Sequence, residues 1–552
     1  MVKVKRDSVN EFVFRISDFV SKNKTEVIFL IGILLLGAFL RLYKIDQYMT
    51  FLGDEGRDAI IVRRLLVNFD PILIGPGTSI GNMYLGPIYY YLIAPFLLLA
   101  NFSPVGPSVF IALLGVATIF FVWFVVRDWF SKGSEPLEES KNFKGGALIA
   151  ALLYGISPVV IIYSRSSWNP NIMPFFSLLT IYSIWKWWFE KKLNWILVTA
   201  ISMGFVLQSH YLGLLLIPII AFFWILSLLK VKGKRQAVKE YVRLSILSIG
   251  IFAILMSPLV LFDARHGWKN FSAIKTFFLE RQTTVSARPW SGVTKLPQLV
   301  FDSNLSVISA KNIDISWIIT YSFFPGLLLI FLKNLFHGLK VKTFNKELLA
   351  GISNRLDNRN IASYFLLAVW IFFAYMGLSL YKQHIYDHYF GFFFTVPFLV
   401  VGAVTNYVFQ KFSKFAKALF ILFMIYTVYI NLADNPLKYP PNKQMQRAAD
   451  VAQKIRVESG NEKMNLAVIA ERNYEDGYQY FLEKWNTPVI DIDPLKYEET
   501  LANQLFVVCE IPKEKCDPTH NPKAQVANFG WSEIEGEWQT GGIWLYKLTH
   551  RQ

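Results

Sequence analysis

Apolar segments long enough to cross a lipid bilayer recur along most of this 552-residue chain. A membrane-spanning helix needs about 20 mostly apolar residues. Hydrophobic residues fill 53% of the positions, more than a soluble domain of this size requires. The sequence therefore predicts an all-α polytopic membrane domain over residues 1–433. We expect eleven spans, near residues 26–42, 106–126, 146–163, 172–189, 194–209, 211–229, 243–262, 314–332, 361–380, 387–406 and 416–432.

Positive charge is concentrated in short clusters between these spans. The net charge is +16, but apolar runs separate the clusters, which is typical of topology signals and not of a nucleic-acid-binding surface. Six basic residues precede the first span: Lys3, Lys5, Arg6, Arg15, Lys22 and Lys24. Eleven spans put the loops 127–145, 190–193, 230–242, 333–360 and 407–415 on the same side. The positive-inside rule then predicts a multi-pass protein of the plasma (inner) membrane with a cytoplasmic N-terminus and no nucleic-acid partner.

One apolar segment, residues 84–100, is left out of the span count. Counting it would place every later basic loop outside. It contains Pro87 and Pro95 and four tyrosines, which favours a helix lying in the membrane interface. We therefore expect residues 44–105 to form one long external loop with juxtamembrane helices; a kinked spanning helix is the alternative.

The composition changes after residue 433. Residues 434–552 are polar enough to fold in water, and their pattern predicts helices at 444–458 and 477–485, strands at 465–470 and 505–510, and a terminal hairpin within 531–548. Eleven spans place this α/β domain outside the cell membrane. It holds both cysteines of the chain, Cys509 and Cys516, which form either a local disulfide or two buried thiols.

The first external loop carries the most informative motif, Asp54-Glu55-Gly-Arg57-Asp58, shortly after the first span. Carboxylates at a membrane boundary are costly, so such residues usually have a function. Other charged and polar side chains fall on the same face, and they predict a polar cavity at the outer leaflet. These residues are Arg165, Asn169, His210, Tyr211, Arg265, His266, His384 and His388. Arginines that reach lipid headgroups and histidines that simply lie in the interface are the alternative for each of them.

These motifs resemble the GT-C membrane glycosyltransferases, and within them the protein O-mannosyltransferase and lipid A aminoarabinose transferase group (glycosyltransferase family 39). The resemblance covers roughly residues 25–430. It implies that Asp54-Glu55 is the catalytic acidic pair, that Arg57 completes an Asp-Glu-x-Arg pattern, and that Arg165 in Tyr-Ser-Arg faces the donor phosphate. The C-terminal domain does not look like the β-trefoil module of the eukaryotic mannosyltransferases, so the resemblance implies the reaction class and not the sugar.

The chemistry that these residues suit is sugar transfer from a polyprenyl-phosphate donor to an acceptor hydroxyl of a protein, lipid or glycan, on the extracytoplasmic face and with inversion. Asp54 is expected to act as general base, and Glu55 to orient the acceptor or an arginine; the reverse assignment of the two roles is the alternative. Arg57, Arg165 and Arg265 are expected to bind the donor phosphate.

Asn169, His210, Tyr211, His266, His384 and His388 are expected to bind substrate. The histidine spacing matches no standard metal motif, so a divalent metal is not favoured. A transporter or lipid flippase with an external accessory domain is the alternative function, but it predicts inverted repeats that we do not find in the sequence.

Overall fold

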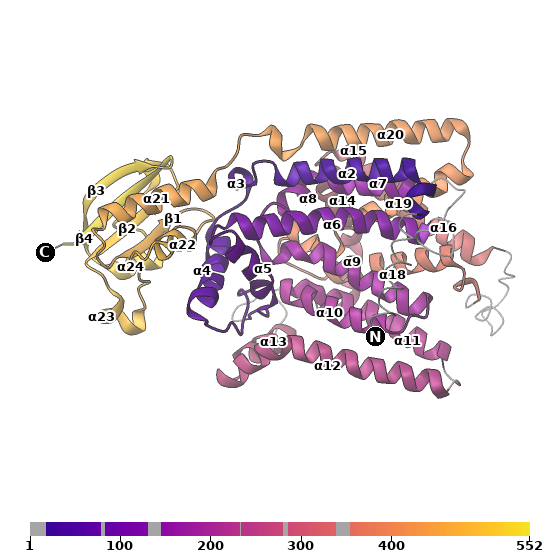
Figure 1. The fold of residues 1–552 in the computed structure, drawn as a ribbon, viewed down its shortest axis with the longest axis horizontal. Helices are drawn as coiled ribbons and strands as arrows, with labels where there is room; N and C mark the ends of the chain where they lie inside the picture. Colours follow the sequence, from indigo (N-terminus) through magenta and orange to yellow (C-terminus); the bar gives the residue numbers. More distant parts are fainter. Residues whose placement is uncertain are drawn as a thin grey trace.

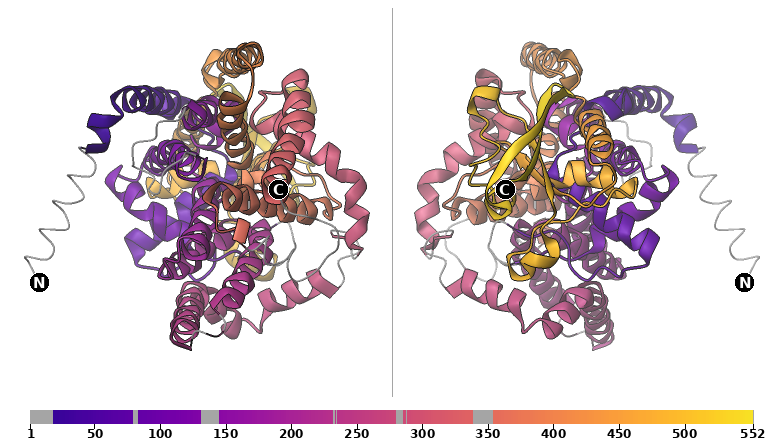
Figure 2. Two further views of the ribbon diagram at one scale, coloured as in Figure 1. Left: turned by 90° about the vertical axis from the view of Figure 1, so that its right-hand side faces the viewer. Right: turned by 90° about the vertical axis from the view of Figure 1, so that its left-hand side faces the viewer.

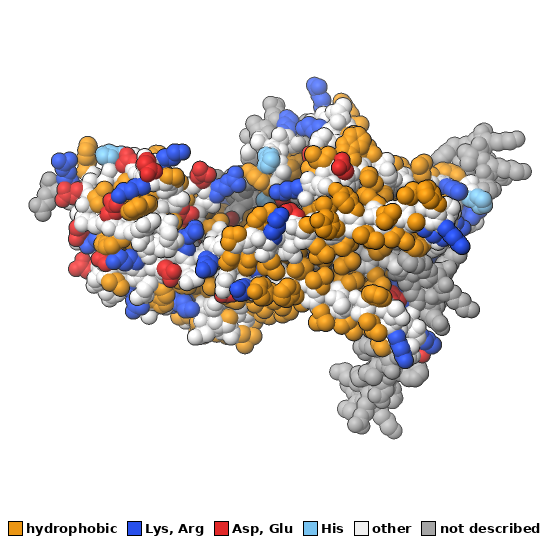
Figure 3. Space-filling view, turned by 90° about the horizontal axis from the view of Figure 1, so that it is seen from above, with side chains coloured by type: hydrophobic (Ala, Val, Ile, Leu, Met, Phe, Trp, Pro, Cys, Tyr) orange, Lys and Arg blue, Asp and Glu red, His pale blue; other side chains and the backbone are white. Residues whose placement is uncertain are grey.

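The protein consists of a long helical bundle and a small α/β domain at one end of it (Figure 1). This computed structural model describes residues 18–78, 83–130, 145–231, 233, 235–279, 285–286, 288–337 and 354–551. Figure 2 views the molecule from either end, and its right-hand view looks onto the C-terminal sheet in front of the bundle. In Figure 3, hydrophobic side chains cover the helical part, whereas charged side chains gather over the C-terminal domain. An apolar outer surface is expected where lipid surrounds a protein.

Each of the eleven segments predicted to span the membrane coincides with helix, which confirms the polytopic α-helical domain. Those helices are α2 (Lys24–Leu42), α6 (Val105–Phe130), α7 (Gly145–Ile156) with α8 (Pro158–Tyr163), α9 (Met173–Ile184) with the π-helix η2 (Trp185–Phe189), α10 (Trp195–Ser209), η3 (Tyr211–Leu216) with α11 (Ile217–Val231), α12 (Arg235–Arg265), α15 (Ile313–Ile318) with η5 (Ile319–Phe323) and α16 (Phe324–Phe336), α18 (Arg359–Ser379), η6 (Asp387–Phe393) with α19 (Val396–Lys411), and α20 (Lys414–Ala433).

By length and composition, fewer than eleven helices qualify as membrane spans. Within the described residues, seven helices are long and apolar enough to cross a membrane, and η6 with α19, bent by 54°, would make an eighth. Shorter apolar helices such as α7 and α10 account for the difference. The number of eleven spans therefore stays a prediction.

The shorter helices beside the bundle are α3 (Ile45–Tyr48), α4 (Gly53–Asn68), α5 (Ile88–Leu99), η1 (Asn169–Ile172), α13 (Lys269–Leu279), η4 (Pro289–Lys295) and α14 (Leu296–Val307). The apolar segment that was left out of the span count forms α5. Its 12 residues rise only about 18 Å at 1.5 Å per residue, whereas a bilayer core is about 30 Å thick. Helices α4 and α5 lie where the bundle meets the C-terminal domain (Figure 1).

The C-terminal domain has the predicted α/β pattern. Its strands are β1 (Asn465–Ile469), β2 (Gln504–Cys509), β3 (Ser532–Thr540) and β4 (Ile543–His550), in the order β1-β2-β4-β3, and its helices are α21 (Gln444–Glu458), α22 (Asp476–Lys484), α23 (Tyr497–Thr500) and α24 (Ala524–Phe529), with 3-10 turns η7 (Pro436–Lys438), η8 (Pro494–Lys496) and η9 (Lys513–Lys515). Strands β1 and β2 pair in parallel and are fully buried, and β3 and β4 form the predicted hairpin. A disulfide joins Cys509 and Cys516.

The apolar core of the C-terminal domain also contains side chains from α4 and from the juxtamembrane segment before it. One cluster of buried apolar side chains contains Phe51 and Ile60, from the loop before α4 and from α4 itself, together with Val451 of α21 and Phe481 of α22. A hydrogen bond joins the same parts: the Phe51 N–H donates to the Gln444 side-chain oxygen at 3.0 Å. The C-terminal domain is therefore packed firmly onto helix α4 and the loop that precedes it.

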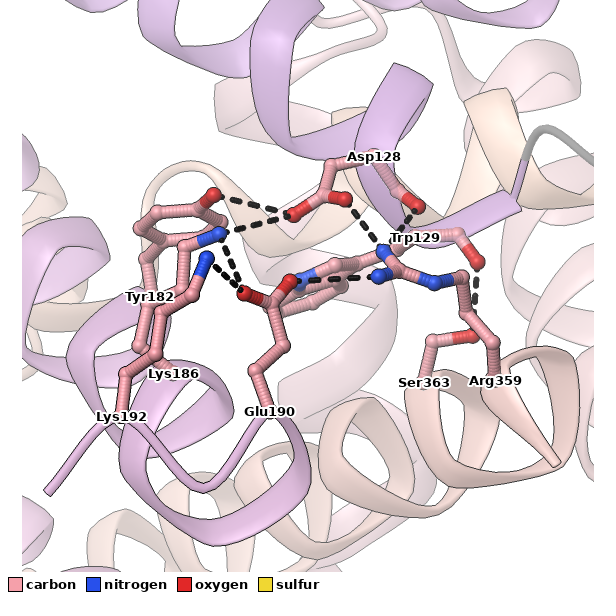
Figure 4. A network of polar contacts seen from close by, with 8 residues as sticks. All are labelled: Asp128, Trp129, Tyr182, Lys186, Glu190, Lys192, Arg359 and Ser363. Carbon is pink, nitrogen blue, oxygen red and sulfur yellow. Dashed lines mark hydrogen bonds and ion pairs between the residues drawn. The ribbon is translucent and has the colours of Figure 1, made fainter. Parts of the chain in front are cut away.

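A buried ionic network ties three helices together at the other end of the bundle (Figure 4). Arg359, at the start of α18, pairs with Asp128 of α6 and donates to Glu190 at 3.2 Å. Lys186 of η2 donates to Glu190 at 2.9 Å, and the Tyr182 hydroxyl donates to Asp128 at 2.9 Å. Each carboxylate in this apolar region thus has several charged or polar partners, as burial demands.

We expect Arg359→Met to lower the stability of the bundle by about 3–5 kcal/mol, because it removes one of the two cations that pair with the buried Asp128 carboxylate. Thermal unfolding of the purified protein in detergent would measure the effect. Arg243→Ala, which removes an exposed pair with Glu240, should leave the transition unchanged. Equal transitions for Arg359→Met and the wild type would show that the network contributes nothing to stability.

Candidate active site

The acidic motif occupies the first turn of helix α4, which begins at Gly53. The Glu55 carboxylate turns back and accepts the Leu52 N–H at 3.0 Å, so it satisfies one of the N–H groups that a helix start leaves free. The positive end of the helix dipole also favours acidic side chains here. Local helix chemistry therefore explains why Asp54 and Glu55 stand side by side at this point.

The acidic side chains of this turn have different surroundings. The Asp54 side chain is 41% exposed, whereas Asp58 is 1% exposed. Arg57 bridges the two, with 2.8 Å from its guanidinium to each carboxylate. The Tyr90 hydroxyl of α5 also donates to Asp58, at 3.1 Å. One arginine thus holds an exposed carboxylate and a buried one in fixed positions.

Burial changes the proton affinity of the two hidden carboxyls. It raises the pKa of Glu55 to about 7, and the neighbouring Asp54 and Asp58 charges add to the rise. Burial also raises the pKa of Asp58 to about 6, although Arg57 opposes the rise. Asp54 is the most exposed acidic side chain of this turn.

That space is a cavity of about 200 Å³ at the junction of the bundle and the C-terminal domain. Its walls come from the start of α4, from the segment between α8 and η1, and from the loop after β1. The lining residues are Thr50, Leu52, Gly53, Asp54, Glu55, Ile162, Tyr163, Ser166, Trp168, Asn171, Arg472 and Tyr474. A narrower crevice shares Tyr163 and Asn171 with it and continues among the bundle helices as far as His388 and Gly391.

Four of the predicted substrate-binding residues lie together near this crevice. The Trp168 ring packs on His388 at 4.7 Å between centroids, and His388 lies 5.8 Å from His210. His210 stacks on Tyr211, and burial lowers the pKa of His210 to about 3, so its ring is neutral. Asn169 is buried and donates to a backbone carbonyl at 2.6 Å.

Arg165 points away from the cavity. Its guanidinium donates to the carbonyls of Leu40 at 3.1 Å and Tyr43 at 2.7 Å, and it lies over the Tyr48 ring at 4.7 Å. These carbonyls belong to the C-terminal end of α2, where a cation is favoured. In this conformation Arg165, 2% exposed, joins α2 to the cavity wall; its neighbour Ser166 lines the cavity.

The structure does not bring Arg265, His266 or His384 to the Asp54 cavity. Arg265 ends α12, and His266 stacks on Phe262 of the same helix. His384 is exposed and packs on the ring of Tyr386. None of these three residues lines the cavity, so their roles stay predictions. The described residues contain no group of three or more His, Cys, Asp or Glu side chains that could hold a metal ion.

Two cavity residues, Arg472 and Tyr474, did not figure in the sequence analysis. They lie in the loop that follows β1, at the carboxyl end of a strand in a parallel pair. Ligands of α/β domains commonly bind at that end of the strands. The predicted strand at 465–470 could therefore have pointed to the loop after it as a ligand-binding segment. Nothing in the sequence indicated that this loop contacts the segment that carries Asp54.

Comparison with known proteins bears on the fold of the protein. The sequence model of a family described as dolichyl-phosphate-mannose-protein mannosyltransferase matches residues 85–262. No curated protein matches the chain. Two crystal structures of ArnT from Cupriavidus metallidurans, one bound to undecaprenyl phosphate and one in the apo state, align with TM-scores of 0.55 at 12% and 11% identity, and cover 95% of this chain and 98% of ArnT.

A weaker likeness, at a TM-score of 0.48 and 14% identity, links 85% of the chain with 64% of the Archaeoglobus fulgidus oligosaccharyltransferase. The ArnT structures establish the fold. Their alignment covers 95% of the chain, and the family model matches residues 85–262 of the membrane domain. They confirm the resemblance to the group that contains the mannosyltransferases and the aminoarabinose transferase. The protein is a multi-pass membrane protein with the fold of the GT-C glycosyltransferases.

Proposed function

We propose that this protein transfers a sugar from a polyprenyl-phosphate donor to an acceptor hydroxyl in the Asp54 cavity, with inversion at the anomeric carbon. The observation that carries the proposal is the position of Asp54, an exposed carboxylate in a cavity between an apolar bundle and a polar domain. A lipid-linked donor can enter from the bundle side and an acceptor from the water side. ArnT, which shares the fold, has been solved with undecaprenyl phosphate bound.

In this reaction Asp54 acts as the general base. It takes the proton of the acceptor hydroxyl as the new oxygen–carbon bond forms, while the bond from the sugar to the phosphate breaks and the lipid phosphate leaves with its electron pair. Arg57 holds the Asp54 carboxylate in place through their 2.8 Å contact. Glu55 also lines the cavity, but its carboxylate accepts the Leu52 N–H, and we assign it to shaping the start of α4.

The remaining predicted contacts divide by position. Asn169, His210, Tyr211 and His388 are proposed to form the floor of the substrate site next to the crevice. Arg165 and Arg265 would reach a donor phosphate only through a change of conformation, because Arg165 is engaged by carbonyls and Arg265 lies outside the cavity. His266 and His384 do not line the cavity, so they too would reach the substrate only through a change of conformation. We place the site on the extracytoplasmic face of the plasma membrane.

Asp54→Asn should fold normally, still bind donor lipid, and lose transfer by about 10²–10⁴-fold, the usual contribution of a general base. Transfer of labelled sugar from a polyprenyl-phosphate donor by purified protein would measure it. Asp70→Asn, at an exposed aspartate just after α4, is the matched control and should retain full activity. Near-normal turnover of Asp54→Asn would refute the base assignment, and substrate crossing liposomes without covalent transfer would favour the transporter alternative.

Glu55 should make the protein less stable as the pH rises. Its pKa is raised from 4.5 to about 7, so the folded protein holds a proton that the unfolded chain has already released. This contribution to stability is full below pH 4.5 and is lost as the pH rises through 7. Asp58 and Asp476 affect the pH dependence of stability in the same direction, because their pKa values are also raised, to about 6.

A comparison of the wild type with Glu55→Gln isolates the Glu55 contribution, since glutamine can still accept the Leu52 N–H. Between pH 5 and pH 8, the thermal transition in detergent should fall further for the wild type than for Glu55→Gln. Parallel pH profiles for the two proteins would contradict the raised pKa.

The proposed orientation can be tested with one new cysteine. The two cysteines of the chain are joined in a disulfide, so Glu498→Cys would place a single free thiol on an exposed turn of the C-terminal domain. It should react with an impermeant maleimide on intact cells. Lys411→Cys, exposed in a loop predicted to be cytoplasmic, should react only after permeabilisation. The reverse pattern would invert the topology and move the site to the other face.

A further inference from the structure

The segment after β1 is fixed to the start of helix α4 by a hydrogen bond and by a close approach at two glycines. The Gly53 N–H donates to the Asn473 side-chain oxygen at 2.9 Å. A β-carbon on Gly53 would lie 2.6 Å from Tyr474, and one on Gly56 would lie 2.4 Å from the backbone of Asp476. Both distances are shorter than any van der Waals contact. The two glycines of the acidic motif therefore allow the C-terminal domain to approach α4 this closely.

The loop after β1 is also hydrogen-bonded within the C-terminal domain. Asn473 is buried, and its amide donates to Glu510, just beyond β2, at 2.5 Å. The Tyr474 N–H donates to the same Asn473 oxygen that receives Gly53, at 2.9 Å. Arg472 and Tyr474 therefore stand on either side of a fixed anchor, and both line the cavity with Asp54.

The arginines near the cavity differ in the partners to which they are already bound. Arg57 is bound to two carboxylates, and Arg165 is bound to the carbonyls at the end of α2. Arg472 is exposed, and the structure assigns it no hydrogen bond or ion pair with any described residue. Among the described residues that line the cavity, Arg472 is the only cationic one, and it shares that lining with Asp54 and Glu55.

We propose that Arg472 of the C-terminal domain binds the phosphate of the lipid-linked donor, so that the domain completes the active site. The inference rests on the proposed function, because a donor phosphate is the anion that the reaction brings to the cavity. A guanidinium binds phosphate oxygens in a bidentate manner, and it stabilises the charge that develops on the leaving phosphate. The acidic character of the α4 turn makes such a cation necessary, since Arg57 alone cannot balance Asp54, Asp58 and an incoming phosphate.

Binding of undecaprenyl phosphate to the full-length protein in nanodiscs would test the proposal without requiring transfer. Arg472→Gln should weaken binding by about 10–100-fold, the range for losing a charge-assisted hydrogen bond. Arg472→Lys should recover only part of the loss, because lysine keeps the charge and not the bidentate geometry. Arg456→Gln, at an exposed arginine of α21 that does not line the cavity, should bind like the wild type. Unchanged thermal transitions would show that all three variants fold.

The outcomes separate this inference from the proposed function. Equal binding by Arg472→Gln and the wild type would overturn the inference alone. No binding by the wild type would overturn the donor class and the inference with it. In the transfer assay, Arg472→Gln should raise the KM for the donor and leave the KM for the acceptor unchanged. A change confined to the acceptor KM would assign Arg472 to an anionic acceptor and overturn its role at the donor.

Discussion

The close contact between helix α4 and the loop after β1 is the constraint on which the site depends. Gly53 and Gly56 stand three residues apart, so they lie on one face of α4. Both would collide with the C-terminal domain if they carried a β-carbon. Asp54 and Glu55 lie between them in sequence and therefore take their directions from this contact. The apolar cluster that runs from Phe51 to Phe481 holds the same interface together from behind. The small domain thus forms one wall of the cavity and fixes the helix that carries the opposite wall.

Electrostatics then divides the acidic turn into parts with different functions. Three carboxylates within one turn would repel one another if all were equally solvated and ionised. Burial raises the proton affinity of Glu55 and Asp58, and Arg57 offsets part of the remaining charge. Asp54 keeps its access to the cavity. In this arrangement Arg57, the nearest arginine, is already paired with two carboxylates. A donor phosphate therefore needs another cation, which we propose to be Arg472.

The sequence predicted the features that depend on local pattern. Apolar runs located the helices, and the change of composition located the α/β domain. That residues 84–100 do not span the membrane stays a prediction, since α5 and α7 each have 12 residues. Features that depend on distant contacts were not predictable. Arg165 matched a family motif, but its carbonyl partners on α2 are more than 120 residues away. Arg472 lies 418 residues from Asp54 by numbering (472 − 54), and no periodicity in one segment indicates which backbone will contact the other.

The two ends of the bundle serve different purposes, and together they explain why the cavity can keep its shape. At one end, Asp128, Glu190 and Arg359 join three helices by buried ion pairs. At the other end, the helices meet α4 and the C-terminal domain, which are joined by a close backbone approach, the hydrogen bond from Gly53 to Asn473 and the Arg64–Glu483 ion pair. The cavity takes its walls from a juxtamembrane helix, a bundle segment and a water-facing loop. A reaction that joins a lipid-borne donor to an acceptor from water needs all three surroundings at one point. Because hydrogen bonds join these walls to one another, Asp54 and the groups around it can be held in place before either substrate arrives, which is the arrangement that electrostatic catalysis requires.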